Sequence, residues 1–493
     1  MVFKSKGALC QEKLESKGCR NTIRSTWFIV AVSQVSLRYA MGANMKQLQT
    51  SSNSITEGVI WRQLLIFFFP LLFGTFFQQL YTTIDAIVVG KYVSKEALSA
   101  VGGTTGVIIN LFVGCFVGIS TGATVTISQY YGAKKEENVS KAVHSAIMLA
   151  LVGGTVIMSI GLIGAPAALR LMGTPESIMP YSLVFIRIYF GGMTANLTYN
   201  MGAGILRAIG DSRRPLYFLI ASCFLNIILD ILFVIIFKWG VAGAAIATVI
   251  SQFFSAALVC LALMKSNDCY RLYVRKIRFH REMLNRIIHI GIPAGFQSLM
   301  YSVSNVLIQS SINQFGTDTI AAWAAYGKID GIFWMIMGSF GISVTTFVGQ
   351  NYGAGKNDRV KKGILVCLVM AVSAAICLSI LLSFGGTYVY RWFTKDDQVI
   401  KKGMEILHFL VPTYCTYVSI EIFSGSLRGM GSAIIPMILS CLGVCVLRIL
   451  WIFTAVPIHT NIRTVIFSYP LTWSVTSILF ITYFFIYKKK HAL

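Results

Sequence analysis

Charged side chains are scarce in this chain of 493 residues, because Asp, Glu, Lys and Arg together make up only 12% of it. A soluble domain carries about 25%, whereas 55% of the residues here are hydrophobic. This composition excludes an ordinary soluble domain and indicates an integral membrane protein. The net charge of +23 does not indicate nucleic-acid binding. Its Lys and Arg residues lie in short segments between apolar runs, and no basic face or helix stands out.

Motifs for metal binding and catalysis are missing as well. The 11 cysteines and six histidines are scattered, without a Cys-x-x-Cys pair or a His-Glu-x-x-His sequence, so no metal or other cofactor is expected. Gly118-Ile-Ser120-Thr-Gly122 matches a hydrolase pattern but lies inside an apolar run rather than at a strand-to-helix turn. Gly114, Gly118 and Gly122 at four-residue spacing instead predict a face for close helix packing. The chain is therefore not expected to be an enzyme.

The chain does contain an internal repeat: the same hydrophobic pattern occurs twice, and the two copies lie 221 residues apart. The motif Gln-x-Tyr-Gly-Ala begins at Gln129 and again at Gln350, and Leu206-Arg207 recurs at the same offset. Six apolar runs long enough to cross a bilayer fall in each copy. Because six is even, both copies enter the membrane from the same side. The sequence therefore predicts an all-α membrane protein of twelve transmembrane helices, in two six-helix lobes related by a parallel repeat. The expected spans are 60–90, 101–130, 140–163, 179–202, 214–237, 240–264, 285–314, 319–350, 361–386, 403–425, 433–456 and 465–487.

Basic residues indicate the orientation and the domain boundaries. They follow both copies of the Gln-x-Tyr-Gly-Ala motif, recur through 265–286 and end the chain at 488–490. The positive-inside rule places this side and both termini in the cytoplasm, with the chain in the plasma (inner) membrane. We expect a first lobe at 45–264, a linker at 265–283 and a second lobe at 284–493. The linker alternates aromatic and basic residues, which suits either an anionic membrane surface or a solvated connection.

Residues 1–44 differ from the rest of the chain. They hold seven basic residues and only one short apolar stretch, 27–32, while Met45 opens a polar segment that leads into the first span. Our hypothesis is that translation begins at Met45 and that residues 1–44 are disordered or absent.

Asp230 is the clearest candidate for a functional charge. A carboxylate within a span costs several kcal/mol unless it is paired, hydrated or protonated, and Asp230 is the one ionisable residue of this kind between Pro215 and Phe237. Asn226 lies one helical turn earlier on the same face. Carboxylate and amide oxygens suit a hard cation such as Na⁺, and the same carboxylate suits a proton. The alternative is a purely structural role.

Asp85 is the second candidate. It follows Pro70 by fifteen residues, and a proline bends a helix or leaves it bendable. Tyr81 lies one turn before Asp85 and is expected to reach its carboxylate. Pro70 and Tyr81 are thus predicted as hinge and support for a titratable group. The alternative is that Asp85 lies near the outer helix end and meets water.

Three further charges suggest a possible polar site in the second lobe. Asp330 either pairs locally with Lys328 or binds substrate. Arg448 is expected to pair with a carboxylate, of which Glu421 is the nearest within the membrane, or to extend to the surface.

Taken together, these motifs resemble the multidrug and toxic compound extrusion (MATE) family from Met45 to the C-terminus. The resemblance rests on the first-span proline followed by Asp85, on both Gln-x-Tyr-Gly-Ala motifs, and on three segments: 206–211 (Leu-Arg-Ala-Ile-Gly-Asp), Asn226-x-x-x-Asp230 and 240–248. It implies a two-lobed antiporter that exports amphipathic or cationic organic compounds in exchange for Na⁺ or H⁺. Small-molecule substrates and the lipid bilayer are its expected partners, and a monomer is expected.

The resemblance also adds residues. It implies a first-lobe ion site at Asp85, Asn226, Asp230 and Thr248. Some members carry a glutamate in the seventh span where this chain has Tyr301, which concentrates the expected coupling in the first lobe. The alternative within this superfamily is a flippase for a lipid-linked substrate, but an anionic headgroup calls for several cavity arginines and only Arg448 qualifies. An intramembrane enzyme is the alternative from another class.

Overall fold

The computed structural model of the protein describes residues 55–490. The hypothesis about residues 1–44 lies outside this range. The first lobe contains α4 (Ile60–Tyr92), α5 (Lys95–Gly102), α6 (Thr104–Gly132), α7 (Glu136–Leu171), α8 (Met179–Gly191), α9 (Met193–Ala208), α10 (Arg213–Asp230), the π-helix η1 (Ile231–Ile236) and α11 (Gly240–Met264).

A connection that includes the short 3-10 helix η2 (Val274–Lys276) leads to the second lobe. The second lobe contains α12 (Arg281–Ile312), η3 (Asn313–Phe315), α13 (Thr317–Gly353), α14 (Asn357–Phe393), α15 (Asp397–Leu410), η4 (Val411–Thr413), α16 (Tyr414–Gly429), α17 (Ile434–Ser440), the π-helix η5 (Cys441–Val446), α18 (Leu447–Ile458), α19 (Ile462–Ile466) and α20 (Ser468–Lys490).

These elements form twelve crossing segments, and the described residues contain no β-strand. Ten segments are long and apolar enough to span a membrane by themselves. The other two are α8 with α9, two short helices that meet at Gly192, and α12, whose apolar stretch is interrupted by polar residues. The predicted fold class, all-α with twelve helices in two lobes, is confirmed.

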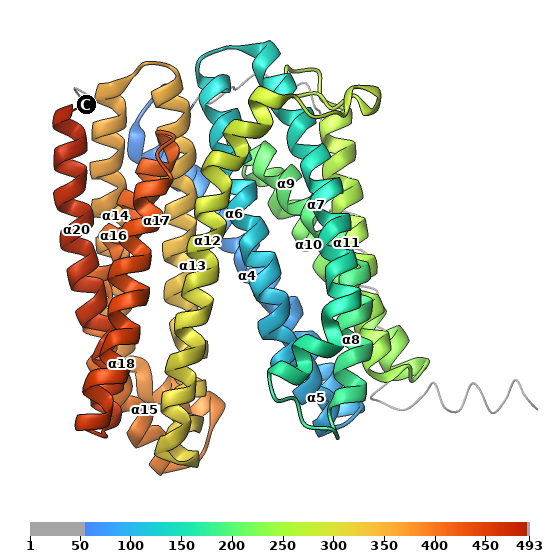
Figure 1. Ribbon diagram of the computed structural model, residues 1–493, viewed down its shortest axis with the longest axis vertical. Helices are drawn as coiled ribbons and strands as arrows, with labels where there is room; N and C mark the ends of the chain where they lie inside the picture. Colours follow the sequence, from blue (N-terminus) through green and yellow to red (C-terminus); the bar gives the residue numbers. More distant parts are fainter. Residues whose placement is uncertain (1–54, 491–493) are drawn as a thin grey trace, which may run out of the picture.

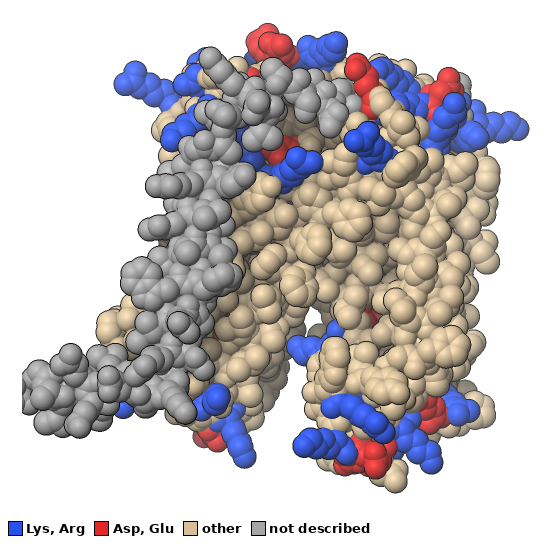
Figure 2. Space-filling view, turned by 180° about the vertical axis from the view of Figure 1, so that it is seen from behind, with Lys and Arg blue, Asp and Glu red and all other residues tan. Residues whose placement is uncertain are grey.

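The two lobes stand side by side, and their helices are joined towards one end and draw apart towards the other (Figure 1). We name the end that holds the C-termini of α6 and α13 the closed end, and the opposite end the open end. The space-filling view shows a hollow between the lobes at the open end (Figure 2). It also shows charged side chains gathered at both ends, with a nearly uncharged band between them (Figure 2). Such a band is what a bilayer requires.

Two helices cross from one lobe to the other. The first half of α4 packs with the core of the second lobe through Leu64, Phe67 and Phe68. Its second half belongs to the first lobe, where Val88 and Val89 are buried against α11. The helix α12 belongs to the second lobe, but its start packs against the first lobe, because Ile287 lies in the first-lobe core. The interface at the closed end is therefore built from exchanged helix starts.

The glycine face predicted on α6 is confirmed, and its partner is α12. A side-chain carbon at Gly118 would overlap the backbone of Gly295, and one at Gly122 would overlap Gly291. Glycine therefore meets glycine across the lobe interface, and the two helix backbones approach each other closely.

The repeated motif makes reciprocal contacts at the closed end. Gln129 Nε2 donates to the carbonyl of Gly429 at 2.7 Å, and Gln350 Nε2 donates to the carbonyl of Ala208 at 2.7 Å. Each glutamine thereby satisfies a carbonyl in the last turn of a helix in the other lobe, a group that has no partner within its own helix. Arg286 adds hydrogen bonds to Gln129 and Tyr130.

Candidate functional site

Asp85 lies inside the first lobe rather than at a wet helix end. Its side chain is 5% exposed, so the alternative reading of a solvated carboxylate is wrong. Thr248 on α11 faces it, and the Thr248 hydroxyl lies 3.0 Å from both Asp85 Oδ2 and the carbonyl of Ala244. A hydroxyl has one hydrogen, so Thr248 donates to Asp85 or to its own helix.

Asp230 and Asn226 also lie next to Asp85. Both are buried, and both interact with the Asp85 side chain. Asp230 is the last residue of α10, and the backbone then widens into the π-helix Ile231–Ile236. A π-helical turn inside a span is rare and often marks a functional site. The four residues that the resemblance implies therefore converge on one point, from α4, α10 and α11.

The charges at this point are unbalanced. No Lys or Arg forms an ion pair with Asp85 or Asp230 in the range 55–490. Asp85 Oδ1, both carboxylate oxygens of Asp230 and both polar atoms of the Asn226 amide make no hydrogen bond to another described group. Two adjacent buried carboxylates repel each other unless one is protonated or a cation lies between them. The group of carboxylate, amide and hydroxyl oxygens fits Na⁺ or a proton equally well.

A narrow polar pocket adjoins this point. It is lined from α4, α9, α10 and α11 by Gln78, Tyr81, Asn196, Tyr199, Asn200, Leu219, Ser222, Asn226, Thr248, Ser251, Gln252 and Ser255.

Most of these lining residues were not predicted from the sequence. Uncharged polar residues in spans usually bond to their own helix, as Asn200 does to Asn196. Their spacing was the available signal. Ser222, Asn226 and Asp230 recur every four residues, which places them in one stripe on α10.

The predicted hydrogen bond between Tyr81 and Asp85 is wrong. The Asp85 carboxylate accepts a hydrogen bond from Thr248 and interacts with Asn226 and Asp230, whereas the Tyr81 side chain interacts with Gln78 and lines the pocket. One-turn spacing put the two residues on one helix face but did not fix the direction of either side chain. Pro70 lies within an uninterrupted α4, near the end of the segment that packs against the second lobe, which includes Phe68 and Leu71.

The three charges predicted in the second lobe form no ion pair with one another among the described residues. Asp330 accepts hydrogen bonds from Tyr326, Tyr414 and Trp334, and no ion pair with Lys328 exists between residues 55 and 490. The pairing of Arg448 with Glu421 is also not formed. Glu421 lies near Arg428 at 3.8 Å, which removes it as a partner for Arg448.

Arg448 is buried, and it does not extend to the surface as the alternative reading has it. Its guanidinium lies 4.2 Å from the centre of the Tyr469 ring and donates to Thr472. The aromatic face and the hydroxyl offset part of the cost of burying this guanidinium.

Comparisons with known proteins agree with this architecture. The family model described as MatE matches residues 70–232 and 293–454, one segment in each copy of the repeat. The "Probable multidrug resistance protein YoeA" of Bacillus subtilis strain 168 is 28% identical over 441 residues, covering 87% of this chain and 95% of that protein. The "Probable multidrug resistance protein NorM" of Bacillus cereus strain ATCC 10987 is 24% identical over 405 residues, covering 80% and 87%.

Solved structures share the fold. The crystal structure of a MATE protein in a bent conformation superposes with a TM-score of 0.82 at 21% identity, covering 89% of this chain and 98% of that one. With the family match over both copies, this chain belongs to the MatE family, the multidrug and toxic compound extrusion family of efflux transporters.

Proposed function

We propose that this efflux transporter is a secondary active antiporter, which exports amphipathic or cationic organic compounds in exchange for Na⁺ or H⁺. The observation that carries the proposal is the adjacent burial of Asp85 and Asp230 without a basic neighbour in the described residues. Such a pair gains a cation or a proton at little cost, and changes its charge when it does so. Asp85, Asn226, Asp230 and Thr248 form the coupling site in this proposal.

The closed end faces the cytoplasm in this proposal. Lys134 and Lys135 follow α6 at that end, Lys356 follows α13, and α20 ends there in three lysines. The positive-inside rule then puts the open end outside the plasma membrane. The coupling ion enters from that side, and the protein works as a monomer.

Transport proceeds by rocking of the two lobes. Ion and drug need no direct contact, because each shifts the equilibrium between inward-facing and outward-facing states through its different affinity for the two. α4 connects the coupling site to the lobe interface. Phe68 belongs to the second lobe, Asp85 belongs to the first, and Pro70 lies between them at a point where the helix bends readily.

Proteoliposomes that carry the protein and a fluorescent organic cation test the proposal under an imposed Na⁺ gradient or an imposed pH gradient. We expect one of the two gradients to drive accumulation, and Asp85→Asn and Asp230→Asn each to abolish it. Passive equilibration of the cation through the protein is expected to persist. Glu96→Gln is the matched control, because Glu96 is an exposed carboxylate of the same lobe. Undiminished gradient-driven transport in both Asp variants would contradict the mechanism.

A further inference from the structure

The linker between the two lobes is held against α7 at two adjacent residues. The backbone N–H of Tyr273 donates to Nε2 of His144 at 3.0 Å, and Nδ1 of His144 donates to the carbonyl of Ser140 at 2.7 Å. A neutral imidazole has one donor and one acceptor, so both ring nitrogens are used. The backbone N–H of His280 donates to the hydroxyl oxygen of Ser145 at 3.0 Å. The linker therefore has a fixed place at the closed end, beside α7 (Figure 1).

The attachment lies at the boundary of the apolar part of α7. His144 and Ser145 directly precede the stretch 146–169, which contains no charged residue. At about 1.5 Å per residue this stretch is about 36 Å long, a little more than the hydrocarbon core of a bilayer, which is about 30 Å thick. Lys141, three residues before His144, is the last charged residue before it. The linker is therefore held at the level of the phospholipid headgroups.

The linker is strongly basic around its two attachment points. Residues 271–281, which we name the basic linker, contain no Asp or Glu and five basic residues: Arg271, Arg275, Lys276, Arg278 and Arg281. None of the five forms an ion pair with another residue in the range 55–490. Partial burial, and next the positive charge of Arg278, lower the pKa of His280 within this segment. The basic linker is thus a concentration of positive charge without a counter-charge of its own.

Apolar side chains lie between these charges and are exposed. Val274 is 65% exposed, Tyr273 is 42% exposed and Phe279 is 39% exposed. Lys276 Nζ lies 4.8 Å from the centre of the Tyr273 ring, and the guanidinium carbon of Arg271 lies 5.1 Å from it. Aromatic and basic residues together are typical of a membrane surface, where rings lie at the level of the headgroups. The basic linker therefore offers positive charge and apolar contact side by side.

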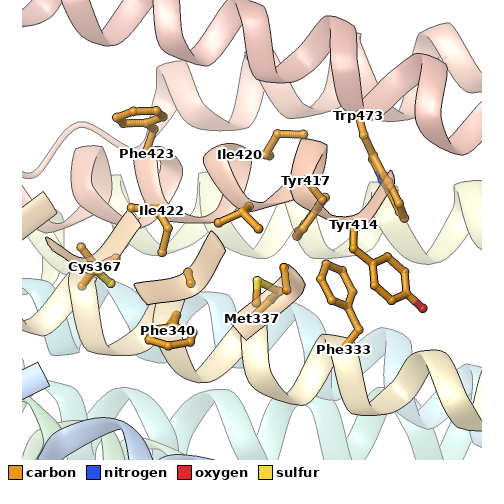
Figure 3. Packing of buried hydrophobic residues seen from close by; sticks show 14 of the residues in the cluster. Phe333, Met337, Phe340, Cys367, Tyr414, Tyr417, Ile420, Ile422, Phe423 and Trp473 are labelled. Carbon is orange, nitrogen blue, oxygen red and sulfur yellow. The ribbon is translucent and has the colours of Figure 1, made fainter. Parts of the chain in front are cut away.

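The exposed rings of the basic linker differ from the rings inside the second lobe. There Phe333 stacks face to face on Tyr414 with the ring centres 3.9 Å apart (Figure 3), and both side chains are buried. Such rings stabilise a core and are closed to a partner. Among the described residues Tyr273 has one ring neighbour, His144 at 6.3 Å, and Phe279 has none. The rings of the basic linker are therefore open to a partner.

We propose that the basic linker binds anionic phospholipid headgroups in the leaflet at the closed end, with Val274 and Phe279 in contact with the apolar part of the same lipids. The charge selects an anionic lipid over a zwitterionic one, because each Lys or Arg near an anionic surface strengthens association about fivefold. The attachment to α7 at headgroup level and the exposed apolar side chains favour a lipid over a soluble anion. The bound lipids anchor the connection between the two lobes to the membrane.

Photo-crosslinking of the full-length protein in nanodiscs tests the proposal. Two lipid analogues carry the same photoreactive group on the headgroup, one made from phosphatidylglycerol and one from phosphatidylcholine. Mass spectrometry measures the yield of adducts on peptides from 265–283. We expect the yield from the phosphatidylglycerol analogue to be about tenfold higher or more. Equal yields from the two lipids would overturn the proposal. Because nanodiscs have the same lipids in both leaflets, the result does not depend on the orientation of the protein.

Removal of three charges tests the role of the basic side chains. Arg275→Gln, Lys276→Gln and Arg278→Gln combined are expected to lower the ratio of the two yields to about one. These side chains are exposed and contribute none of the backbone hydrogen bonds that hold the linker. An unchanged ratio in this triple variant would contradict the assignment.

A second triple variant is the matched control. Lys488→Gln, Lys489→Gln and Lys490→Gln combined remove three exposed charges from the last turn of α20, at the same end of the molecule. We expect the adduct ratio at the linker to stay as in the unaltered protein. If the control lowers this ratio as far as the first triple variant does, net charge alone attracts the lipid and the proposal is wrong.

Two further measurements separate a lipid surface from a soluble anion. Phe279→Ser leaves every charge in place and removes apolar contact, so we expect it to lower the yield from the phosphatidylglycerol analogue about threefold or more. Glycerol phosphate and an RNA oligonucleotide added in solution are expected not to compete with the lipid. Competition by either anion, or an unchanged yield in Phe279→Ser, would overturn the assignment to a lipid surface.

Discussion

At the scale of single residues, the coupling site depends on a hydroxyl with two acceptors. Thr248 lies equally far from Asp85 Oδ2 and from the Ala244 carbonyl. While Asp85 is anionic, the charge attracts the hydroxyl proton, and once a proton or Na⁺ neutralises Asp85 the backbone carbonyl competes better. Thr248 thus responds to the charge state of Asp85.

Thr248→Val keeps the shape of the side chain and removes this hydrogen bond. A hydrogen bond to a charged group contributes about 1.5–3 kcal/mol, so we expect the half-maximal concentration of the driving ion to change about tenfold or more. Thr248→Ser should restore the hydrogen bond and with it the half-maximal concentration of the unaltered protein. The measurement is transport rate against Na⁺ or proton concentration in proteoliposomes. Thr155→Val is the control, because the Thr155 hydroxyl donates only to the carbonyl of Leu151 in its own helix. An equal change in the half-maximal ion concentration in both valine variants would contradict the role of Thr248.

The sequence predicts the members of this site better than their contacts. Asp230 and Asp85 stand out because an isolated carboxylate in an apolar run is costly. Their adjacency depends on how α4 packs against α10, which neither residue's local sequence determines. Thr248 is like many other span hydroxyls and came from the resemblance alone, while Asn196 and Ser222 were missed for the same reason. For Asp330 the sequence left open a pair with Lys328 or a role in substrate binding, and it did not reveal the aromatic donors, which come from α16 as well as from its own helix.

At the scale of helices, the contact of α6 with α12 leaves no room for a side chain. Gly122 meets Gly291, and Gly118 meets Gly295. This contact exists while the closed end is shut, so it is a contact of one conformational state. A side chain placed in it selectively destabilises that state.

Gly122→Val is therefore expected to shift the protein towards a state with the lobes apart at the closed end. Overpacking costs about 1–3 kcal/mol, which corresponds to roughly a tenfold change in the equilibrium. Cys115 reports on it without further mutation, because its backbone contacts Gly295 in the same interface. Its maleimide labelling, followed by peptide mass spectrometry, should become faster.

Gly385→Val is the matched substitution, since a carbon at Gly385 meets no atom within 4 Å. Faster labelling of Cys115 in that variant as well, or unchanged labelling in Gly122→Val, would contradict the assignment.

The sequence predicts the helices more fully than their irregularities. All twelve expected spans exist, because a long apolar run has no other stable conformation in a bilayer. The break at Gly192 and the π-helix after Asp230 were not expected. Neither is associated with a proline. The glycine face on α6 was predictable from its spacing, whereas its partner across the interface was not.

At the scale of the whole molecule, the repeat produces a closed end with approximate two-fold symmetry. Gln129 and Gln350 are equivalent by sequence, and each donates to the last turn of a helix in the other lobe at the same distance. The symmetry is broken by Arg286, which binds Gln129 and Tyr130. The equivalent position of the first copy is Leu65, so Gln350 has no equivalent arginine to hydrogen-bond with.

This asymmetry predicts unequal effects from two equivalent substitutions. Gln350→Leu leaves one helix-end carbonyl without its donor, at a cost of about 1–3 kcal/mol. Gln129→Leu removes the matching bond and also leaves the Arg286 guanidinium short of an acceptor, so it should open the closed end further. Hydrogen–deuterium exchange of the peptides 125–133 and 346–354 measures the opening. We expect faster exchange in both variants, with the larger increase in Gln129→Leu.

Gln309→Leu is the control, since Gln309 is exposed and its side chain bonds only to Asn313. Equal increases in the two variants would mean that Arg286 does not stabilise the closed end, and no increase in either would mean that the repeated motif does not hold the lobes together.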